Sequence, residues 1–331
     1  MIRHCLTTGH HDLTPFDGAA LARDVIVPAG GTIRRGAILD SALRTRLDAA
    51  PGLTVVVVIA EPDEIAQGEA SRRVAAALVG PGAHAEPPHQ GQVIVRAATT
   101  GLARIAPETV EAVNRAGSIL LATSLDGRIV KPDDVLAVVK AARLWVSEKD
   151  VADALAVIPA EPAFRVAPFT VREAAFIAGQ RIRPANFDLA VPNLEAALTR
   201  RGAHLAATEH LTDQPAEILA AYRRQIERGA GVILVAGSIL LDPGDPYVVA
   251  VEELGGQITC QGAPIDPGTM FWVGEVGDTV FLGLASCELY GRLSILDLIL
   301  PYALAQEPIT PALFAQLGYG GLLEQTAAAR R

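Results

Sequence analysis

Short apolar runs alternate with helix-like patterns through the second half of the chain, from residue 171 to residue 304. Three of these runs, at residues 174–178, 232–236 and 280–284, have the length and apolar content of buried strands. Between them, segments such as residues 216–228 place apolar side chains three and four residues apart, which is the spacing of one helix face. Strands that alternate with helices in this way predict βαβ units and a mostly parallel sheet.

Further elements complete this α/β pattern. The same criteria predict helices at residues 192–201, 245–254 and 291–304, and strands at residues 204–210, 257–261 and 270–275. We therefore expect a three-layer α/β domain with a mostly parallel sheet at residues 166–331.

Two smaller α+β regions are expected before this domain, because 331 residues exceed the length that one hydrophobic core usually serves. The first covers residues 1–83, and the second, with a linker, covers residues 84–165. The first region is expected to contain a hairpin around Gly30-Gly31 (residues 21–27 and 32–39), a strand at 55–60 and a helix at 69–79. The second is expected to contain strands at 92–98, at 118–123 and within 130–146, helices at 107–115 and 148–157, and the linker at 160–168.

Charge and cysteine content exclude several classes of protein. The formal net charge of −9 argues against a nucleic-acid-binding protein, whose footprint is a basic patch. The three cysteines form no CxxC pair and no disulfide framework, which is typical of a reducing cytoplasm. The longest apolar run, residues 53–60, is far too short to span a membrane. We expect a cytoplasmic protein without a nucleic-acid or membrane partner.

Four loops are the expected ligand site, because ligands of open α/β sheets lie beyond the carboxyl ends of the strands. The loops are residues 179–188, 211–215, 237–245 and 285–291. They carry these polar residues: Arg181, Arg183, Asp188, Asp213, Ser238, Asp242, Asp245, Ser286 and Glu288. Carboxylates suit Mg²⁺ that bridges to phosphate, and helix N-termini suit the phosphate itself.

Three acidic residues and one glycine in these loops also have a purely structural interpretation. Asp245 precedes a proline, so it is either a metal or ligand contact or a helix N-cap. Asp242 lies in a Pro-Gly loop, where a turn-forming Asp is the alternative to a ligand contact. Asp213 lies near a helix start, where capping is the alternative. Gly237 allows either a close approach of the backbone to a ligand or a plain tight turn.

Three segments, in order along the chain, resemble the molybdopterin-binding domain that molybdopterin adenylyltransferases and molybdopterin molybdotransferases share. They are residues 231–238 with 242–245, residues 262–268, and residues 281–287. The whole chain also resembles the front part of bacterial proteins that join this domain to a molybdenum-cofactor nucleotidyltransferase. That wider likeness is carried by residues 17–39 and 317–323.

The resemblance implies binding of molybdopterin or molybdenum cofactor, with Mg²⁺ and with ATP or AMP if the protein is an enzyme. It implies a catalytic and metal-binding role for Asp245 and Asp242. Together with the four loops, it predicts that the ligand is contacted by Gly237, Ser238, Asp213, Ser286 and Glu288. The implied partners are molybdoenzymes or a nucleotidyltransferase, and the chain is expected to form a homo-oligomer.

Two departures from the family pattern leave the activity open. The turn after residue 236 lacks the family's second glycine and its threonine, and Ala285-Ser286 replaces a Pro-Gly pair. One alternative is an enzyme of adenylyl transfer or molybdate insertion. The second is a non-catalytic carrier or regulator with the same pocket, and the third is a protein that binds another nucleotide-like ligand.

Overall fold

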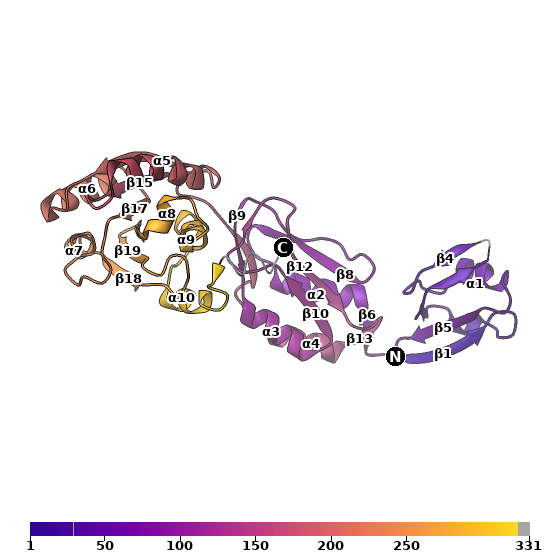
Figure 1. The fold of residues 1–331 in the computed structure, drawn as a ribbon. Helices are drawn as coiled ribbons and strands as arrows, with labels where there is room; N and C mark the ends of the chain where they lie inside the picture. The colour runs from indigo at the N-terminus through magenta and orange to yellow at the C-terminus, as the bar shows by residue number, and fades with distance from the viewer. Residues whose placement is uncertain (29, 324–331) are drawn as a thin grey trace. The chain divides into compact units, whose positions relative to one another are not determined.

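The computed structural model describes residues 1–28 and 30–323 (Figure 1). The chain divides into two compact units, residues 1–166 and residues 167–331. The end of the predicted C-terminal domain, residues 324–331, lies outside the described residues. No helix among the described residues has the length and apolar character needed to cross a membrane.

The first unit begins with a three-stranded sheet and a short hairpin. The sheet has the order β1-β5-β2, and the hairpin pairs β3 with β4. The elements are β1 (Ile2–Thr7), a 3₁₀ helix (Thr14–Phe16), β2 (Ala20–Leu21), β3 (Val25–Val27), β4 (Gly31–Ile33), α1 (Ser41–Asp48) and β5 (Thr54–Ile59). Alternate residues of β5, Val55 and Val57, pack with Leu43 and Leu47 of α1 in one core. The predicted hairpin is confirmed, although its strands are shorter than expected.

A second, antiparallel sheet with the order β10-β12-β8-β7 lies in the rest of this unit, together with the pair β13-β6. Its strands are β7 (Ala83–Ala85), β8 (Gln92–Ala97), β10 (Ile119–Thr123) and β12 (Val135–Ala141). The remaining elements are β6 (Glu64–Ala66), α2 (Gln67–Leu78), β9 (Gly101–Ile105), α3 (Pro107–Ala116), β11 (Ile129–Val130), β13 (Trp145–Ser147) and α4 (Glu148–Ala156). The buried stripe of α2, which includes Ala70, Val74 and Leu78, joins the core of β8 and β12. The structure therefore packs α2, from the first predicted region, onto strands of the second.

The expected linker at residues 160–168 is wrong for its second half. Residues Phe164–Pro168 form β14, which adds to a small sheet with the order β11-β9-β14. Phe164 and Val166 are buried in the core of the first unit. Proline at the end of a strand is compatible with pairing, so the prolines of this segment did not exclude a strand.

The second unit is built on a six-stranded sheet with the order β16-β15-β17-β20-β19-β18. β15, β16, β17 and β20 are parallel to one another, whereas β19 and β18 are antiparallel additions. The strands are β15 (Glu173–Ala178), β16 (His204–His210), β17 (Val232–Ala236), β18 (Gln257–Gln261), β19 (Trp272–Val276) and β20 (Thr279–Leu284). The helices are α5 (Pro184–Thr199), α6 (Pro215–Glu227), α7 (Pro246–Glu253), α8 (Ser286–Leu289), α9 (Ile295–Leu304) and α10 (Pro311–Leu317).

Helices cover both faces of this sheet. Ile177 and Val235 face the side where α6 and α7 pack, in one core with Phe281. Phe176 faces the other side and stacks on Phe187 of α5, with ring centroids 5.3 Å apart. Successive side chains of a strand point to opposite faces, so an apolar strand of this kind needs both layers. The predicted α/β fold with a mostly parallel sheet is confirmed.

Two helix starts differ from expectation. α5 begins at Pro184, so Pro192 lies inside the helix rather than at its start, and part of the expected loop 179–188 is helical. The stacking of Phe187 on Phe176 anchors the added turns, in a helix where Pro192 cannot donate one backbone hydrogen bond. The last long helix begins at Ile295 rather than at residue 291, because Ser294 and Asp297 form a capping box there.

Candidate functional site

The carboxyl ends of the four parallel strands lie at one edge of the sheet. Ala178 at the end of β15 pairs in register with His210 of β16 and with Ala236 of β17, which in turn pairs with Leu284 of β20. The loops that follow these strands therefore start side by side, as the sequence predicts. We call this edge, with the loops that follow the four strands, the carboxyl edge.

A fifth loop, residues 262–271, reaches the same edge and was not predicted. It joins β18 to β19, and Trp272 at the start of β19 lies opposite Gly283, near the end of β20. The indole of Trp272 donates a hydrogen bond to Ser238 Oγ at 3.1 Å. A side chain at position 283 would begin inside this indole, since a Cβ there would lie 1.9 Å from Trp272 Nε1. The glycine within a strand was the available sequence signal of this close approach.

Asp245 is buried, with 1% of its surface exposed, and both of its carboxylate oxygens accept hydrogen bonds. Oδ1 accepts from Ser238 Oγ at 3.0 Å and from the N–H of Tyr247 at 3.1 Å. Oδ2 accepts from the N–H of Ile239 at 2.6 Å. The N-cap interpretation of Asp245 is therefore correct for α7, and the same carboxylate also ties down the start of the preceding loop.

The other two acidic residues have different structural roles. Asp242 is exposed, and its Oδ1 accepts a hydrogen bond from the N–H of Gly244 at 2.9 Å, as a turn-forming Asp does. The capping role considered for Asp213 is wrong, because Gln214 is the N-cap of α6. Asp213 Oδ1 instead accepts from Tyr247 Oη at 3.0 Å and from the N–H of Gln180 at 3.2 Å. Burial, and next the hydrogen bond to Asp213, raise the pKa of the Tyr247 phenol, so it stays a donor.

The backbone at Gly237 is in a conformation that glycine adopts readily, with φ of +104°. A Cβ at this position would lie 3.2 Å from the backbone nitrogen of Gly179, in the loop after β15. The observed close approach thus joins two loops of the carboxyl edge.

Three backbone N–H groups of the loop at residues 237–245 have no partner among the described residues. Within residues 1–28 and 30–323, no hydrogen bond is donated by the N–H of Ser238, Leu240 or Leu241. The loop is half-buried at Ser238 and Leu240 and exposed at Leu241. N–H groups of this kind, on a loop that follows a strand, can bind an anion without Lys or Arg.

Glu288, on the short helix α8, is a buried acid at the end of β20, with 2% of its surface exposed. Its Oε2 accepts a hydrogen bond from Cys287 Sγ at 3.3 Å, whereas its Oε1 is buried and has no hydrogen-bond partner in the part of the chain that the structure describes. Burial raises the pKa of Glu288. Burial, and next the charge of Glu288, raise the pKa of the Cys287 thiol to about 11, so this thiol is a poor nucleophile. Ser286 is exposed at the start of α8.

The donor set at the carboxyl edge does not fit a magnesium ion held by protein ligands. Asp245 is buried and already accepts three hydrogen bonds, and Asp242 holds its own turn. Within the described part of the chain, no three side chains of His, Cys, Asp or Glu gather closely enough to hold a metal ion. A phosphate fits better, because the N–H groups of Ser238, Leu240 and Leu241, which have no partner among the described residues, can donate to its oxygens.

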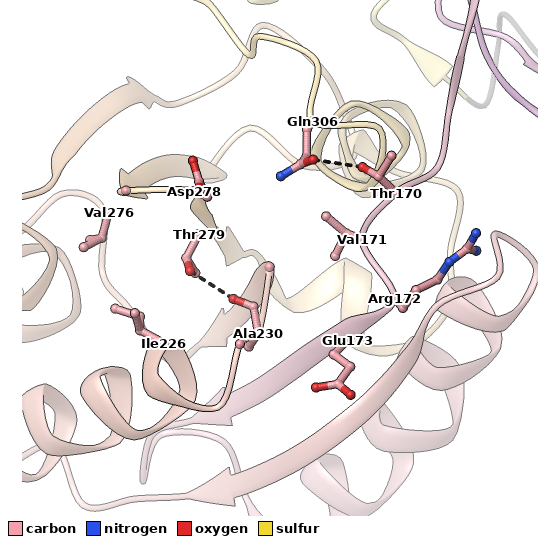
Figure 2. A pocket seen from close by; sticks show the side chains of 13 residues that line it. Thr170, Val171, Arg172, Glu173, Ile226, Ala230, Val276, Asp278, Thr279 and Gln306 are labelled. Carbon is pink, nitrogen blue, oxygen red and sulfur yellow. Dashed lines mark hydrogen bonds between the residues drawn. The ribbon is translucent and has the colours of Figure 1, made fainter. Parts of the chain in front are cut away.

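A separate cavity of about 680 Å³ lies at the opposite, amino end of the parallel strands (Figure 2). It is lined by residues just before β15 and β17 and by the turn between β19 and β20. The side chains of Thr170 and Gln306 point toward each other there and form a hydrogen bond of 3.0 Å. The predicted polar residues of the four loops do not line this cavity. We therefore keep the carboxyl edge, where helix N-termini and loop N–H groups converge, as the candidate site.

A scan against models of protein families gives no match for this sequence, and a search of curated proteins gives none either. Among solved structures, the molybdopterin biosynthesis MoeA protein from Pyrococcus horikosii aligns with 73% of this chain and 79% of its own, at 14% identity and a TM-score of 0.33. A structure of MogA aligns with 41% of this chain and 99% of its own, at 18% identity and a TM-score of 0.32. The molybdopterin biosynthesis enzyme MoaB from a Thermus species aligns with 45% of this chain and 98% of its own, at 17% identity and a TM-score of 0.30. The chain is thus similar to molybdopterin biosynthesis proteins distantly, and in fold alone.

Proposed function

We propose that the second unit binds a phosphorylated pterin, molybdopterin or the molybdenum cofactor, at the carboxyl edge and serves as a carrier or regulator. The observation that carries this proposal is the loop at residues 237–245, whose N–H groups at Ser238, Leu240 and Leu241 have no partner among the described residues. The Asp245 carboxylate accepts hydrogen bonds from Ser238 and Ile239 and so fixes the shape of this loop. The N–H groups are therefore held in place before a ligand binds. Preorganised donors of this kind suit a phosphate group.

The pterin ring would need an apolar surface beside the phosphate. Large hydrophobic side chains are exposed on three loops of the same edge, and Leu241 has 80% of its surface exposed. The others are Ile239, Met270, Tyr290 and Leu293. A flat heteroaromatic ring that packs on such side chains removes apolar surface from water on both partners. The ordered motifs that resemble the molybdopterin-binding domain supply the identity of the ring.

The hydrogen bonds of the Asp245 carboxylate favour a carrier or regulator over an enzyme. In the implied enzymes this Asp is the metal-linked residue, but here its oxygens are occupied by the protein itself. The replacement of the family's Pro-Gly pair by Ala285-Ser286 points the same way. Under this proposal the partners are molybdoenzymes or a nucleotidyltransferase that exchange the cofactor with a homo-oligomer of this chain.

The direct test is to ask whether the pterin co-purifies. The full chain is produced in a host that makes molybdenum cofactor and in a host that cannot make molybdopterin, and both preparations are oxidised with acid and iodine. We expect the fluorescence of an oxidised pterin from the first preparation only. If neither preparation gives pterin fluorescence and added molybdopterin does not bind, the proposal is contradicted and another nucleotide-like ligand is favoured.

A matched pair of glycine variants tests the loop itself. Gly237→Ala introduces a Cβ at 3.2 Å from Gly179 and should abolish retention of the pterin. Gly255→Ala carries a comparable penalty for a positive φ, but its Cβ meets nothing within 4 Å, at the far end of α7. Equal retention by both variants would exclude the loop as the binding site.

Turnover separates the carrier from the enzyme. The protein is incubated with molybdopterin, Mg²⁺ and ATP, and pyrophosphate release is measured. We expect the pterin to stay bound without pyrophosphate release. Release that depends on Asp245 would establish the enzyme of adenylyl transfer instead.

A further inference from the structure

A second polar cavity, of about 590 Å³, lies within the first unit, far along the chain from the carboxyl edge. Its charged lining residues are Asp24, Arg34, Arg35, Lys140 and Arg143. Four cations and one acid surround this space in a chain whose net charge is −9. Such a concentration of positive charge around a cavity opposes the overall balance of the protein and attracts anions.

The single acid of the cavity is used to orient its neighbours. Asp24 pairs with Arg34 at 2.9 Å through one oxygen and accepts the N–H of Arg35 at 2.8 Å through the other. These bonds fix the chain after β4 and compensate the charge of Arg34. The charge of Asp24 also interacts with that of Arg35, and the two remaining cations of the cavity are Lys140 and Arg143.

No ion pair involves Arg35, Lys140 or Arg143 within the residues that the structure describes. Glu64, whose charge interacts with that of Arg143, is paired with the N-terminal amine of Met1 at 2.8 Å. Lys140 is half-buried on β12 and lines the same cavity. Two guanidinium groups and one ammonium group thus surround the cavity without forming an ion pair with any described residue.

The fully buried hydroxyl of Ser71 forms hydrogen-bond contacts with three segments that line or adjoin this cavity. Ser71 Oγ lies 2.8 Å from the carbonyl oxygen of Gln67 and 2.9 Å from that of Gly91, and it accepts the N–H of Ala141 at 2.9 Å. Gln67 and Ala141 line the cavity, and Gly91 follows the lining residue Gln90. One side chain therefore fixes the first turn of α2, the turn before β8 and the end of β12. This rigidity favours binding, because the walls need not be ordered when a ligand enters.

We propose that this cavity binds a small phosphorylated molecule that carries at least two negative charges. Arg35 and Arg143 supply planar donor pairs that match phosphate oxygens, and Lys140 supplies a point charge. The volume suits a ligand of up to nucleotide size. The site belongs to the first unit, so the proposal does not depend on pterin binding by the second unit.

Titration calorimetry of the full chain with inorganic pyrophosphate, at constant ionic strength, tests the proposal. We expect saturable binding that the double variant Arg35→Gln/Arg143→Gln weakens by about tenfold or more. Lys140→Met should also weaken the binding of pyrophosphate. No saturable binding below about 10 mM would overturn the proposal.

Two control variants identify the site. Arg223→Gln removes one positive charge from the exposed face of α6 in the other unit and should change the affinity by no more than about twofold. Gly237→Ala distorts the loop of the carboxyl edge, so we expect the pyrophosphate binding that persists in this variant to be the part that Arg35→Gln/Arg143→Gln weakens. If Gly237→Ala abolishes binding and the double variant does not, the anion belongs to the second unit and the proposal fails. An equal loss with Arg223→Gln would show a general charge effect and would also overturn it.

Discussion

Asp245→Asn should destabilise the second unit although asparagine is nearly isosteric with aspartate. The carboxylate accepts three hydrogen bonds in a buried position, from Ser238, Ile239 and Tyr247. An amide keeps one acceptor oxygen and turns the other position into a donor. If the amide oxygen takes the place of Oδ1 and keeps its two hydrogen bonds, the NH₂ group takes the place of Oδ2. The NH₂ group then faces the N–H of Ile239, which donates to Oδ2 at 2.6 Å in the parent, so two donors meet.

The magnitude follows from that mismatch. A hydrogen bond to a charged acceptor is lost, and a buried donor is left without a partner, which together cost about 2–3 kcal/mol. Asp242→Asn is the matched control, because it makes the same charge change on an exposed turn and keeps an acceptor for Gly244. That control should stay within about 0.5 kcal/mol of the parent.

The assay must report on one unit, since a chain of two units does not unfold in a single two-state step. The chain has two tryptophans, and Trp272 is buried beside Ser238 in the second unit. In a Trp145→Phe background, Trp272 fluorescence during urea unfolding follows the second unit alone. If Asp245→Asn and Asp242→Asn have the same midpoint, Asp245 does not clamp the loop. A stabilisation of the parent by Mg²⁺ that Asp245→Asn lacks would instead support the metal role.

Two further predictions concern the same unit. Because burial raises the pKa of Glu288, the native state favours its protonated form, and stability is lost as pH rises from the ordinary value of 4.5 through the raised one. Glu288→Gln removes this dependence, so its advantage over the parent in the free energy of urea unfolding should grow as the pH rises above 4.5, and a constant difference would contradict the assignment. Gly283→Ala should cost about 3 kcal/mol or more, since its Cβ would lie 1.9 Å from Trp272 Nε1. Gly244→Ala, whose Cβ meets only Asp242 Oδ1 at 3.5 Å, should be close to neutral, and similar costs for the two variants would refute this packing argument.

Most elements of the second unit were predicted from local pattern. β16, β17 and β18 have the bounds that their apolar runs predict, and Asp245 before Pro246 marks the start of α7. These features depend on residues within a few positions of one another, so local sequence patterns are enough to predict them. The parallel order of the strands then brings their loops to one edge, which is why the location of the candidate site was predictable.

The sequence by itself determined the α/β class, the strand and helix order and the edge at which a ligand would meet the loops. Only the tertiary structure decided what the acidic residues of that edge do. Whether Asp245 is free to bind a metal depends on Ser238, Ile239 and Tyr247, and the position of Ser238 depends on Trp272, which lies 34 residues away in sequence. The cavity of the first unit likewise joins Arg35 to Arg143 across more than a hundred residues of chain. Hydrogen bonds and charges between distant segments are satisfied in space, so no local pattern records which of them are already used.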